Sequence, residues 1–384
     1  MHYVGNFLNP TGGAQIFLRG LVHNLQQNYG ITQSIVTRSS SNKTEVIDFG
    51  NIRVYALPRI KIGSYNILRN LFSILRKNNF DIIHIHGYGY YTGDIVCILK
   101  KLNRLQVPLI LNTHGTGGLK HAYLALDLSK PFPFGDRLKR LIHFFYDFTL
   151  GKLEMQTFDK IIISSEEERR YFSLIGLKEN KCIKIPIAVS DIFFEPYIEN
   201  SPSTRDYILY VGRIDRYKGL DTLLKAVKEL RSNRINLRCI IVGKDYGYKH
   251  ELERQVSDLK IKDAVEIKDH VSQSDLLKLY SSALITVLLS DSEGFPLCLV
   301  ESLAMGTPFI GTPVGAIPEL VETTHAGLLV PQDDPKILVE MIKNLLNDTH
   351  KWSNMSRNGK NNISNFSWQQ IAKTYYEIYL RLIQ

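Results

Sequence analysis

Residues 284–305 read LITVLLSDSEGFPLCLVESLAM, and this run changes from a strand pattern to a helix pattern across one polar loop. Leu284–Leu288 is a continuous apolar run, which is typical of a buried strand. Pro296 stands where the first turn of a helix tolerates proline. We therefore expect a strand, a loop that holds Glu293, and a helix from Leu297 to Met305.

Glu301 is the unusual residue of this run, because it falls within the apolar stretch of the expected helix. A carboxylate in such a place is costly to bury without a polar partner. A sugar diol would satisfy it with two hydroxyl donors, and the start of the helix favours a phosphate or sugar oxygen. The run thus points to a ligand site around Glu293 and Glu301.

The same alternation of short strands and longer helices extends along all 384 residues, which favours parallel βαβ units. In the first half we expect strands near His2–Asn6, Ser34–Thr37, Arg53–Ala56, Ile82–His86, Leu109–Thr113 and Lys160–Ser164, and helical stretches at Ala14–Asn28, Ser64–Asn78 and Thr92–Asn103. In the second half we expect strands at Tyr207–Val211, Arg238–Val242, Val265–Ile267, Leu284–Leu288, Pro308–Gly311 and Leu328–Val330. The helices expected there are Leu220–Ser232, His250–Leu259, Gln273–Ser281, Leu297–Met305, Ala316–Val321, Pro335–Asn347 and Trp368–Leu382.

A polar, proline-containing stretch, EPYIENSPSTRD at 195–206, has no apolar period and is typical of a linker. The chain is also long enough for two hydrophobic cores. We therefore predict an α/β protein with two doubly wound, Rossmann-like parallel-sheet domains, residues 1–195 and 196–368.

Two loops carry the residues that suit a diphosphate. Gly12 and Gly13, in PTGGAQ, follow the first expected strand and open a helix, where backbone N–H groups can approach an anion. Arg213 and Lys218, in VGRIDRYKG, lie in a loop between a strand and a helix, where the ends of parallel strands form ligand crevices. Both cations can reach one anion from there, although two solvated loop cations would give the same spacing.

The histidines and cysteines do not predict a metal site. His114 follows a strand in Thr-His-Gly and is the favoured functional histidine, whereas His84 and His86 share one strand face without a third ligand. The four cysteines form no CxxC pair, and the chain has neither an Asp-x-Asp triplet nor a carboxylate cluster suited to Mg²⁺. We therefore expect neither a metal nor a cofactor.

Positive charge gathers in the first half of the chain. Residues 1–190 hold 24 Lys+Arg and 13 Asp+Glu, a net charge of +11, whereas residues 191–384 hold 23 and 25, a net charge of −2. This asymmetry favours an anionic partner such as a phosphorylated acceptor, an acidic membrane surface or nucleic acid, and a merely soluble basic surface is the alternative. No module of clustered aromatic and basic residues is visible, so we expect no nucleic-acid partner.

Residues 131–156 place Leu138, Leu141, Ile142, Phe145 and Phe148 on one helical face beside several basic residues. Such a helix either packs on the domain core, which is the commoner use and the one we predict, or lies on a membrane interface. The sequence has no run long enough to span a membrane and no signal-peptide pattern at its start. We expect a cytoplasmic protein, with peripheral attachment to the inner face of the membrane as the alternative.

Taken together, these segments resemble a retaining glycosyltransferase of family 4, which has the GT-B fold. The resemblance rests on PTGGAQ at 10–15, NTHG at 112–115, GRIDRYKG at 212–219, EGFPLCLVE at 293–301, GTPVGAIPELV with AGLLVP after it, and FSWQQIAKTYYEIY at 366–379. It implies two domains that face each other across a cleft, and a last helix, 369–384, that returns to the first domain. The segment Pro186-Ile187-Ala188-Val189 departs from the family's usual Pro-Asn-Gly-Val.

The resemblance also implies roles for the residues in these motifs. Gly12, Gly13, Arg213 and Lys218 would bind the donor diphosphate, and Glu301 would bind the ribose hydroxyls. Glu293 and His114 would lie beside the donor sugar, with help from the backbone of Phe295, Leu297 and Cys298. No residue is expected to act as a nucleophile, because the family favours a front-face mechanism.

We therefore expect a metal-independent hexosyltransferase that uses a nucleotide-diphosphate sugar, such as a UDP-sugar, and a glycan or lipid-linked acceptor in cell-surface glycan synthesis. Two alternatives stay open. One is a catalytically silent subunit that binds the sugar nucleotide, and the other is a sugar-nucleotide epimerase of the same fold.

Overall fold

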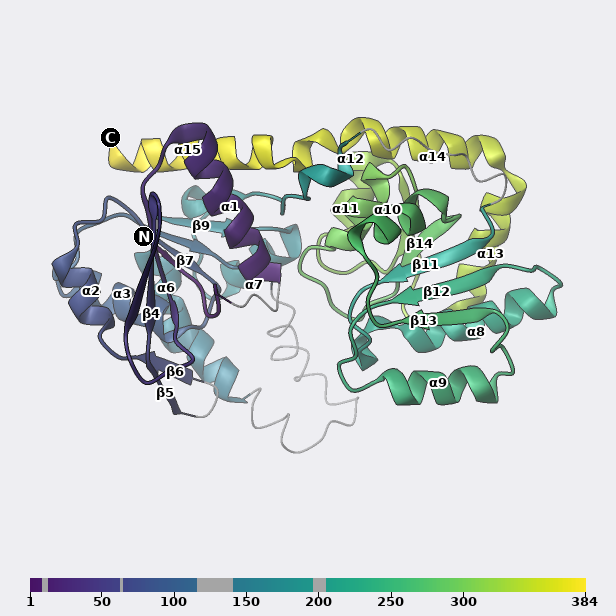
Figure 1. The fold of residues 1–384 in the computed structure, drawn as a ribbon, viewed down its shortest axis with the longest axis horizontal. Coiled ribbons are helices and arrows are strands. Elements are labelled where there is room, and N and C mark those ends of the chain that lie inside the picture. The colour runs from purple at the N-terminus through teal and green to yellow at the C-terminus, as the bar shows by residue number, and fades with distance from the viewer. Residues whose placement is uncertain (9–12, 63–64, 116–140, 196–204) are drawn as a thin grey trace. The chain divides into compact units, whose positions relative to one another are not determined.

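The computed structural model describes residues 1–8, 13–62, 65–115, 141–195 and 205–384. The chain forms two compact units, one of Met1–Ala188 with Trp368–Gln384 and one of Val189–Ser367. The sequence-based boundaries were 1–195 with 369–384, and 196–368. Each unit has its own sheet with helices packed on it (Figure 1), and the predicted α/β, Rossmann-like fold is confirmed.

The sheet of unit 1 has eight strands: β1 (His2–Tyr3), β2 (Gln33–Arg38), β3 (Glu45–Phe49), β4 (Ile52–Leu57), β7 (Ile83–His86), β8 (Leu109–Asn112), β9 (Lys160–Ile163) and β10 (Cys182–Lys184). Their order is β10-β9-β8-β7-β1-β2-β4-β3. Neighbouring strands are parallel except β3, which runs antiparallel to β4. The short strand β1 lies in the middle of this order, so that its residue His2 is paired with His84 of β7.

Unit 1 also contains the antiparallel hairpin β5 (Arg59–Ile62) and β6 (Tyr65–Leu68), and the helices α1 (Gly13–Tyr29), α2 (Leu71–Lys77), α3 (Tyr91–Lys101), α6 (Lys152–Thr157), α7 (Glu166–Leu174) and α15 (Trp368–Ile383). Helices α1 and α15 lie side by side (Figure 1) and share a core with Phe17, Leu21 and Tyr375. Gly20 makes this approach close, because a Cβ there would stand 2.0 Å from the Trp368 ring. The last helix therefore completes the core of the first unit.

The sheet of unit 2 is wholly parallel, with strands β11 (Tyr207–Val211), β12 (Arg238–Val242), β13 (Val265–Lys268), β14 (Ile285–Leu288), β15 (Phe309–Gly311) and β16 (Gly327–Leu329) in the order β13-β12-β11-β14-β15-β16. The helices are α8 (Leu220–Ser232), α9 (Lys249–Asp258), α10 (Gln273–Ser282), α11 (Leu297–Ala304), α12 (Ile317–Thr324), α13 (Pro335–Asn347) and α14 (Thr349–Asn362). The strand order reverses between β11 and β14. Ligands of open α/β sheets bind outside the carboxyl ends of the strands at such a point.

Several predicted elements were wrong in detail. Ser64–Asn78 is not one helix, because Tyr65–Leu68 pairs with β5 as a strand and the helix begins only at Leu71. Helix α14 was not predicted, since it buries only Met355 and Gly359 and so has almost no apolar period. The first strand ends at Tyr3, earlier than predicted.

The helical stretch that follows residue 140 does not bury its apolar face. Residues 141–146 are helical and continue into a π-helix, η2 (Asp147–Gly151). The side chains that we expected on the core are exposed instead: Leu141 by 53%, Ile142 by 59%, Phe145 by 60% and Phe148 by 45%. Packing on the core was therefore the wrong prediction for these four residues, and Leu138 lies outside the described residues. Among the helices that the structure describes, none has the length and apolar content needed to cross a membrane.

Candidate active site

The loop after β11, which carries Arg213 and Lys218, is held in shape by a side-chain contact and by a close backbone approach. Tyr210 Oη donates a hydrogen bond to the carbonyl of Arg213 over 2.7 Å. The loop ends at Gly219, which has φ 64°, and a Cβ there would stand 2.1 Å from the carbonyl oxygen of Leu289. Only glycine permits this close approach. The loop after β11 is thereby pressed against the loop after β14.

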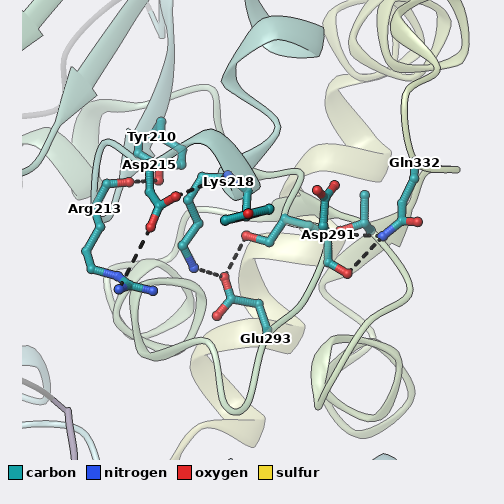
Figure 2. A network of polar contacts seen from close by, with 10 residues as sticks. Tyr210, Arg213, Asp215, Lys218, Asp291, Glu293 and Gln332 are labelled. Atoms are coloured by element: carbon teal, nitrogen blue, oxygen red, sulfur yellow. Dashed lines mark hydrogen bonds and ion pairs between the residues drawn. The ribbon is translucent and has the colours of Figure 1, made fainter. Parts of the chain in front are cut away.

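The two loops are joined by an ion pair. Lys218 Nζ lies 2.5 Å from Glu293 Oε1, and the two side chains are only 11% and 13% exposed. Ser290 Oγ donates to the same carboxylate oxygen over 2.6 Å. Figure 2 shows the side chain of Lys218 reaching Glu293 from the neighbouring loop. The predicted site residues Lys218 and Glu293 are therefore in direct contact.

Arg213 has a more open setting. Its guanidinium lies 3.9 Å from Asp215 and 5.0 Å from the centre of the Tyr246 ring, and its side chain is 55% exposed. In Figure 2 its charged end points to the same side of the loop as that of Lys218. A half-exposed guanidinium held by an aromatic face keeps donors available for an anion.

A second turn fixes the backbone around Glu293. Gly315 has φ 58°, and a Cβ there would stand 2.3 Å from the carbonyl of Glu293. The N–H of Ala316 donates to the carbonyl of Gly294 over 3.1 Å. Helix α11 begins at Leu297, three residues after Gly294, so its first N–H groups face the loop that carries Glu293. The side chain of Phe295 packs towards Phe366, 5.9 Å between ring centres, and so contributes to the site through its backbone.

Glu301 has found a polar partner in the protein. Tyr280 Oη donates to Glu301 Oε2 over 2.8 Å. Burial raises the pKa of Glu301, and the bond from Tyr280 partly offsets this rise. One neutral hydroxyl satisfies only part of a carboxylate, which has about four lone-pair sites. The remaining capacity of Glu301 is therefore open to further hydroxyl donors.

Two side chains of unit 2, Cys298 and Tyr210, lie near several of its charged residues. Burial raises the pKa of the Cys298 thiol, and nearby Glu293 and Glu301 raise it further, whereas Lys218 lowers it. Burial likewise raises the pKa of the Tyr210 hydroxyl. Nearby Cys298 and Glu293 raise this pKa further, whereas Arg213 lowers it. The residues predicted from separate motifs are therefore brought into one electrostatic neighbourhood at the carboxyl ends of β11 and β14.

His114, in unit 1, sits in a left-handed backbone conformation with φ 55° directly after β8. Its Nε2 lies 2.9 Å from His86 Nδ1. The neighbouring Thr113 hydroxyl and Gly115 N–H both donate to Glu168 Oε1, each over 2.7 Å, which fixes the turn. Burial lowers the pKa of His114 to about 3, so the ring is neutral at physiological pH and can exchange hydrogen bonds without carrying charge.

The glycine loop of unit 1 is described only in part. Gly13 is the exposed first residue of α1, and a Cβ built on it would meet no described atom within 4 Å. Gly12 lies outside the described residues. At the start of α11, Leu297 and Cys298 are each partly buried.

Sequence reasoning missed the residues that support the predicted ones. Ser290 donates a hydrogen bond to Glu293, and Tyr280 donates one to Glu301. Glu168 accepts a bond from the Gly115 turn, and His86 is bonded to His114. Ser290 lies three residues before Glu293, a spacing typical of a local hydrogen bond. The other three come from distant segments, so only the fold reveals them.

Two protein families match this chain in succession. Residues 11–191 match "Glycosyltransferase Family 4", and residues 191–362 match "Glycosyl transferases group 1". The chain is 31% identical to a D-inositol 3-phosphate glycosyltransferase of Paenarthrobacter aurescens, over 96% of this chain and 93% of the relative. It is 25% identical to a D-inositol 3-phosphate glycosyltransferase of Kineococcus radiotolerans, over 80% and 73%.

Solved structures share the fold at lower identity. A sucrose-phosphate synthase from Thermosynechococcus elongatus superposes with a TM-score of 0.78 and 24% identity, over 99% of this chain and 98% of the other. The Anabaena protein HepE, in complex with UDP, superposes with a TM-score of 0.75 and 16% identity, over 99% of each chain.

The Lys218–Glu293 pair predicts a measurable coupling. Lys218→Met leaves a partly buried carboxylate without its cation, so we expect a loss of about 1–3 kcal/mol in the free energy of unfolding of unit 2. The double variant with Glu293→Gln should lose less than the sum of the two single variants. Urea unfolding followed by the fluorescence of Trp352, in a Trp368→Phe background, measures the cycle.

The exposed pair Lys249–Asp269, at 2.7 Å in the same unit, is the matched control. The same cycle there should give a coupling below about 1 kcal/mol. Equal couplings for the two pairs would contradict the assignment of a special role to the Lys218–Glu293 contact.

Proposed function

Since this chain belongs to glycosyltransferase family 4, we propose that it is a retaining enzyme that moves a hexose from a nucleotide-diphosphate donor to a glycan or lipid-linked acceptor. The observation that carries the proposal is the arrangement in unit 2 of Arg213 and Lys218 on one loop, the Lys218–Glu293 ion pair, and Glu301 on the helix that follows Glu293. It combines cations for a diphosphate with carboxylate oxygens for hydroxyl groups.

The phosphate part of the proposal rests on Arg213 and Lys218. Arg213 offers a half-exposed planar guanidinium, and Lys218 supplies a more buried ammonium from the same loop. Fixed donors aimed at a leaving diphosphate stabilise the charge that develops as the sugar bond breaks. Two protein cations do this without a metal ion. The glycine loop at Gly12 and Gly13 would add backbone N–H groups from the start of α1.

The sugar part rests on the carboxylates and on helix α11. Glu301 keeps acceptor sites beyond its bond from Tyr280, which suits the two hydroxyls of a ribose. Glu293, tied by Lys218 and Ser290, would lie beside the donor hexose, with the N–H groups at Phe295, Leu297 and Cys298. Because Glu293 already accepts two bonds, we assign it an orienting role and propose no protein nucleophile.

His114 would contact the hexose from unit 1 as a neutral imidazole. Its bond with His86 and the clamp at Glu168 fix the ring, so it can serve one sugar hydroxyl in a defined orientation. The reaction would then proceed on one face of the sugar, with the leaving phosphate taking the proton of the acceptor hydroxyl.

For the nucleotide we propose UDP. The supporting finding is that HepE, which shares the fold, was solved in complex with UDP and with UDP-glucose. For the acceptor, the relatives named for inositol 3-phosphate suggest a phosphorylated molecule as a second candidate. The net charge of +11 over residues 1–190 suits either a phosphorylated or a lipid-linked acceptor at a membrane surface. We place the enzyme in the cytoplasm, in the synthesis of a cell-surface glycan.

A panel of UDP-, GDP- and ADP-hexoses tests the donor. We expect one UDP-hexose to raise the melting temperature and to be hydrolysed slowly to UDP, because water can replace the acceptor. The rate should not change when Mg²⁺ or Mn²⁺ is added, since the two cations of unit 2 replace the metal.

The outcomes of this panel separate the alternatives. Stabilisation without any hydrolysis or transfer would favour a silent binding subunit. Conversion of the UDP-hexose to an isomer would favour the epimerase. A rate that rises with Mg²⁺ would contradict the metal-independent mechanism.

Arg213→Ala tests the diphosphate site. We expect turnover of the preferred donor to fall by about 10²–10³-fold, the usual cost of removing one donor from a developing anion. Unfolding should change by less than about 0.5 kcal/mol, because the side chain is half exposed. The control is Arg216→Ala, an exposed arginine of the same loop, which should keep normal turnover. Normal turnover in Arg213→Ala would refute its role.

We further propose that unit 1 binds an anionic membrane through the exposed apolar residues Leu141, Ile142, Phe145 and Phe148. Vesicles that contain an anionic lipid should bind the protein, and less so at high salt, because salt screens the attraction. Leu141→Ser with Phe145→Ser should weaken this binding several-fold. The control pair Val46→Ser and Phe49→Ser, at positions equally exposed on β3, should not. Equal binding by both double variants would refute the proposal.

A further inference from the structure

Three buried histidines meet in unit 1, outside the residues assigned to the donor. One ring nitrogen from each of His2, His84 and His86 lies within 4.8 Å of the others, and the three side chains are at most 4% exposed. The sequence places His84 and His86 on one strand but gives no third ligand. The fold supplies the third ligand, His2, because strand β1 pairs with strand β7.

The sheet register explains the meeting. His2 is the Cα partner of His84 on the adjacent parallel strand, and His86 lies two residues further along β7, on the same face. His2 Nδ1 stands 3.2 Å from His86 Nε2. In a tetrahedral zinc site with Zn–N bonds of about 2.0–2.1 Å, two ligand nitrogens lie about 3.3 Å apart. These two nitrogens already have the spacing of a tetrahedral edge.

The outer nitrogens of two of the rings are held in place, as they are in protein metal sites. His84 Nδ1 lies 2.7 Å from Tyr379 Oη, and His86 Nδ1 lies 2.9 Å from His114 Nε2. Second partners of this kind fix the tautomer and orientation of ligating histidines.

The inner nitrogen of His84 is left over. His84 Nε2 is buried and has no hydrogen-bond partner among the described residues. An unpaired buried nitrogen carries a desolvation cost that a ligand would remove.

An approach to the cluster exists within unit 1. A cavity of about 650 Å³ is lined by His2 and His84, together with Asp81, Gln33 and Tyr379. The cavity is large enough to bring an ion and water to the edge of His2 and His84, and Asp81 contributes negative charge to its wall. Ligand number, spacing, outer partners and an entry path are the features that a metal site must have.

We propose that His2, His84 and His86 bind one Zn²⁺ ion, with water from the cavity as the fourth ligand. Three imidazoles with no carboxylate or thiolate suit Zn²⁺ among the common ions and do not suit Mg²⁺ or Ca²⁺. The ion cross-links β1 to β7 and fixes His86, which in turn holds His114. The site is structural, and it is separate from the donor chemistry proposed for unit 2.

The test uses the full-length chain without a histidine tag. After incubation with Zn²⁺ and exchange into zinc-free buffer, elemental analysis should find one zinc per chain, and the melting temperature should be higher than that of chelator-treated protein. Protein refilled with Co²⁺ should show the intense visible absorption of a tetrahedral site.

His84→Gln should lose the retained zinc, whereas His23→Gln, at an exposed position on α1, should keep it. Absence of zinc from the wild-type protein would overturn the proposal, and so would equal retention by the two variants. If His84→Gln does not fold, the Co²⁺ spectrum of the wild-type protein decides, since the weak absorption of an octahedral ion would also overturn it. Donor hydrolysis plays no part in these readouts, so their failure is distinct from failure of the proposed function.

Discussion

The contact between Lys218 and Glu293 is the interaction on which the site of unit 2 depends. It joins the loops that follow β11 and β14, the two neighbouring strands at which the strand order reverses. Gly219 allows these two loops to approach within a distance that no Cβ would permit, and Gly315 does the same for the loop after β15 and the backbone at Glu293. The charged pair and the two glycines therefore act together, since the glycines make the approach possible and the pair gives it a defined chemical centre.

A nearly buried ion pair is an expensive way to join two loops if stability is the only purpose. The desolvation of both ions offsets much of their attraction, and an apolar pair of similar volume is often as stable. The same reasoning applies to Glu301, which is partly buried beside one tyrosine hydroxyl and has a raised pKa. Charged groups that are largely desolvated and still have unused hydrogen-bonding capacity are typical of a site that binds a polar ligand.

The sequence predicted the fold well where the apolar period was strong, and less well where it was weak. Strands β11, β12 and β14 have long apolar runs and were placed correctly, whereas α14 and the β5–β6 hairpin have little local pattern. The residues that we propose for the donor site were found because they lie in short motifs. Their supports were not, because Tyr280 and Glu168 reach Glu301 and the Gly115 turn only through the tertiary structure. The prediction that residues 141–148 pack on the core was wrong, because the spacing of apolar residues does not tell whether their helical face is covered by the core or exposed.

The two units contribute different kinds of chemistry to the proposed reaction. Unit 2 holds the fixed cations Arg213 and Lys218, which suit the diphosphate and the charge that develops on it. The candidate residue of unit 1, His114, is neutral, because burial lowers its pKa to about 3. A neutral imidazole cannot compete with the arginine and lysine for the phosphate. The hydrogen bond with His86 fixes the orientation of the His114 ring, so that its other nitrogen can bond to a hydroxyl in one direction. The buried histidines that contact His86 keep His86 itself in place. Unit 2 thus supplies fixed charge, from the half-exposed Arg213 and the ion-paired Lys218, whereas unit 1 supplies a neutral ring whose orientation is fixed.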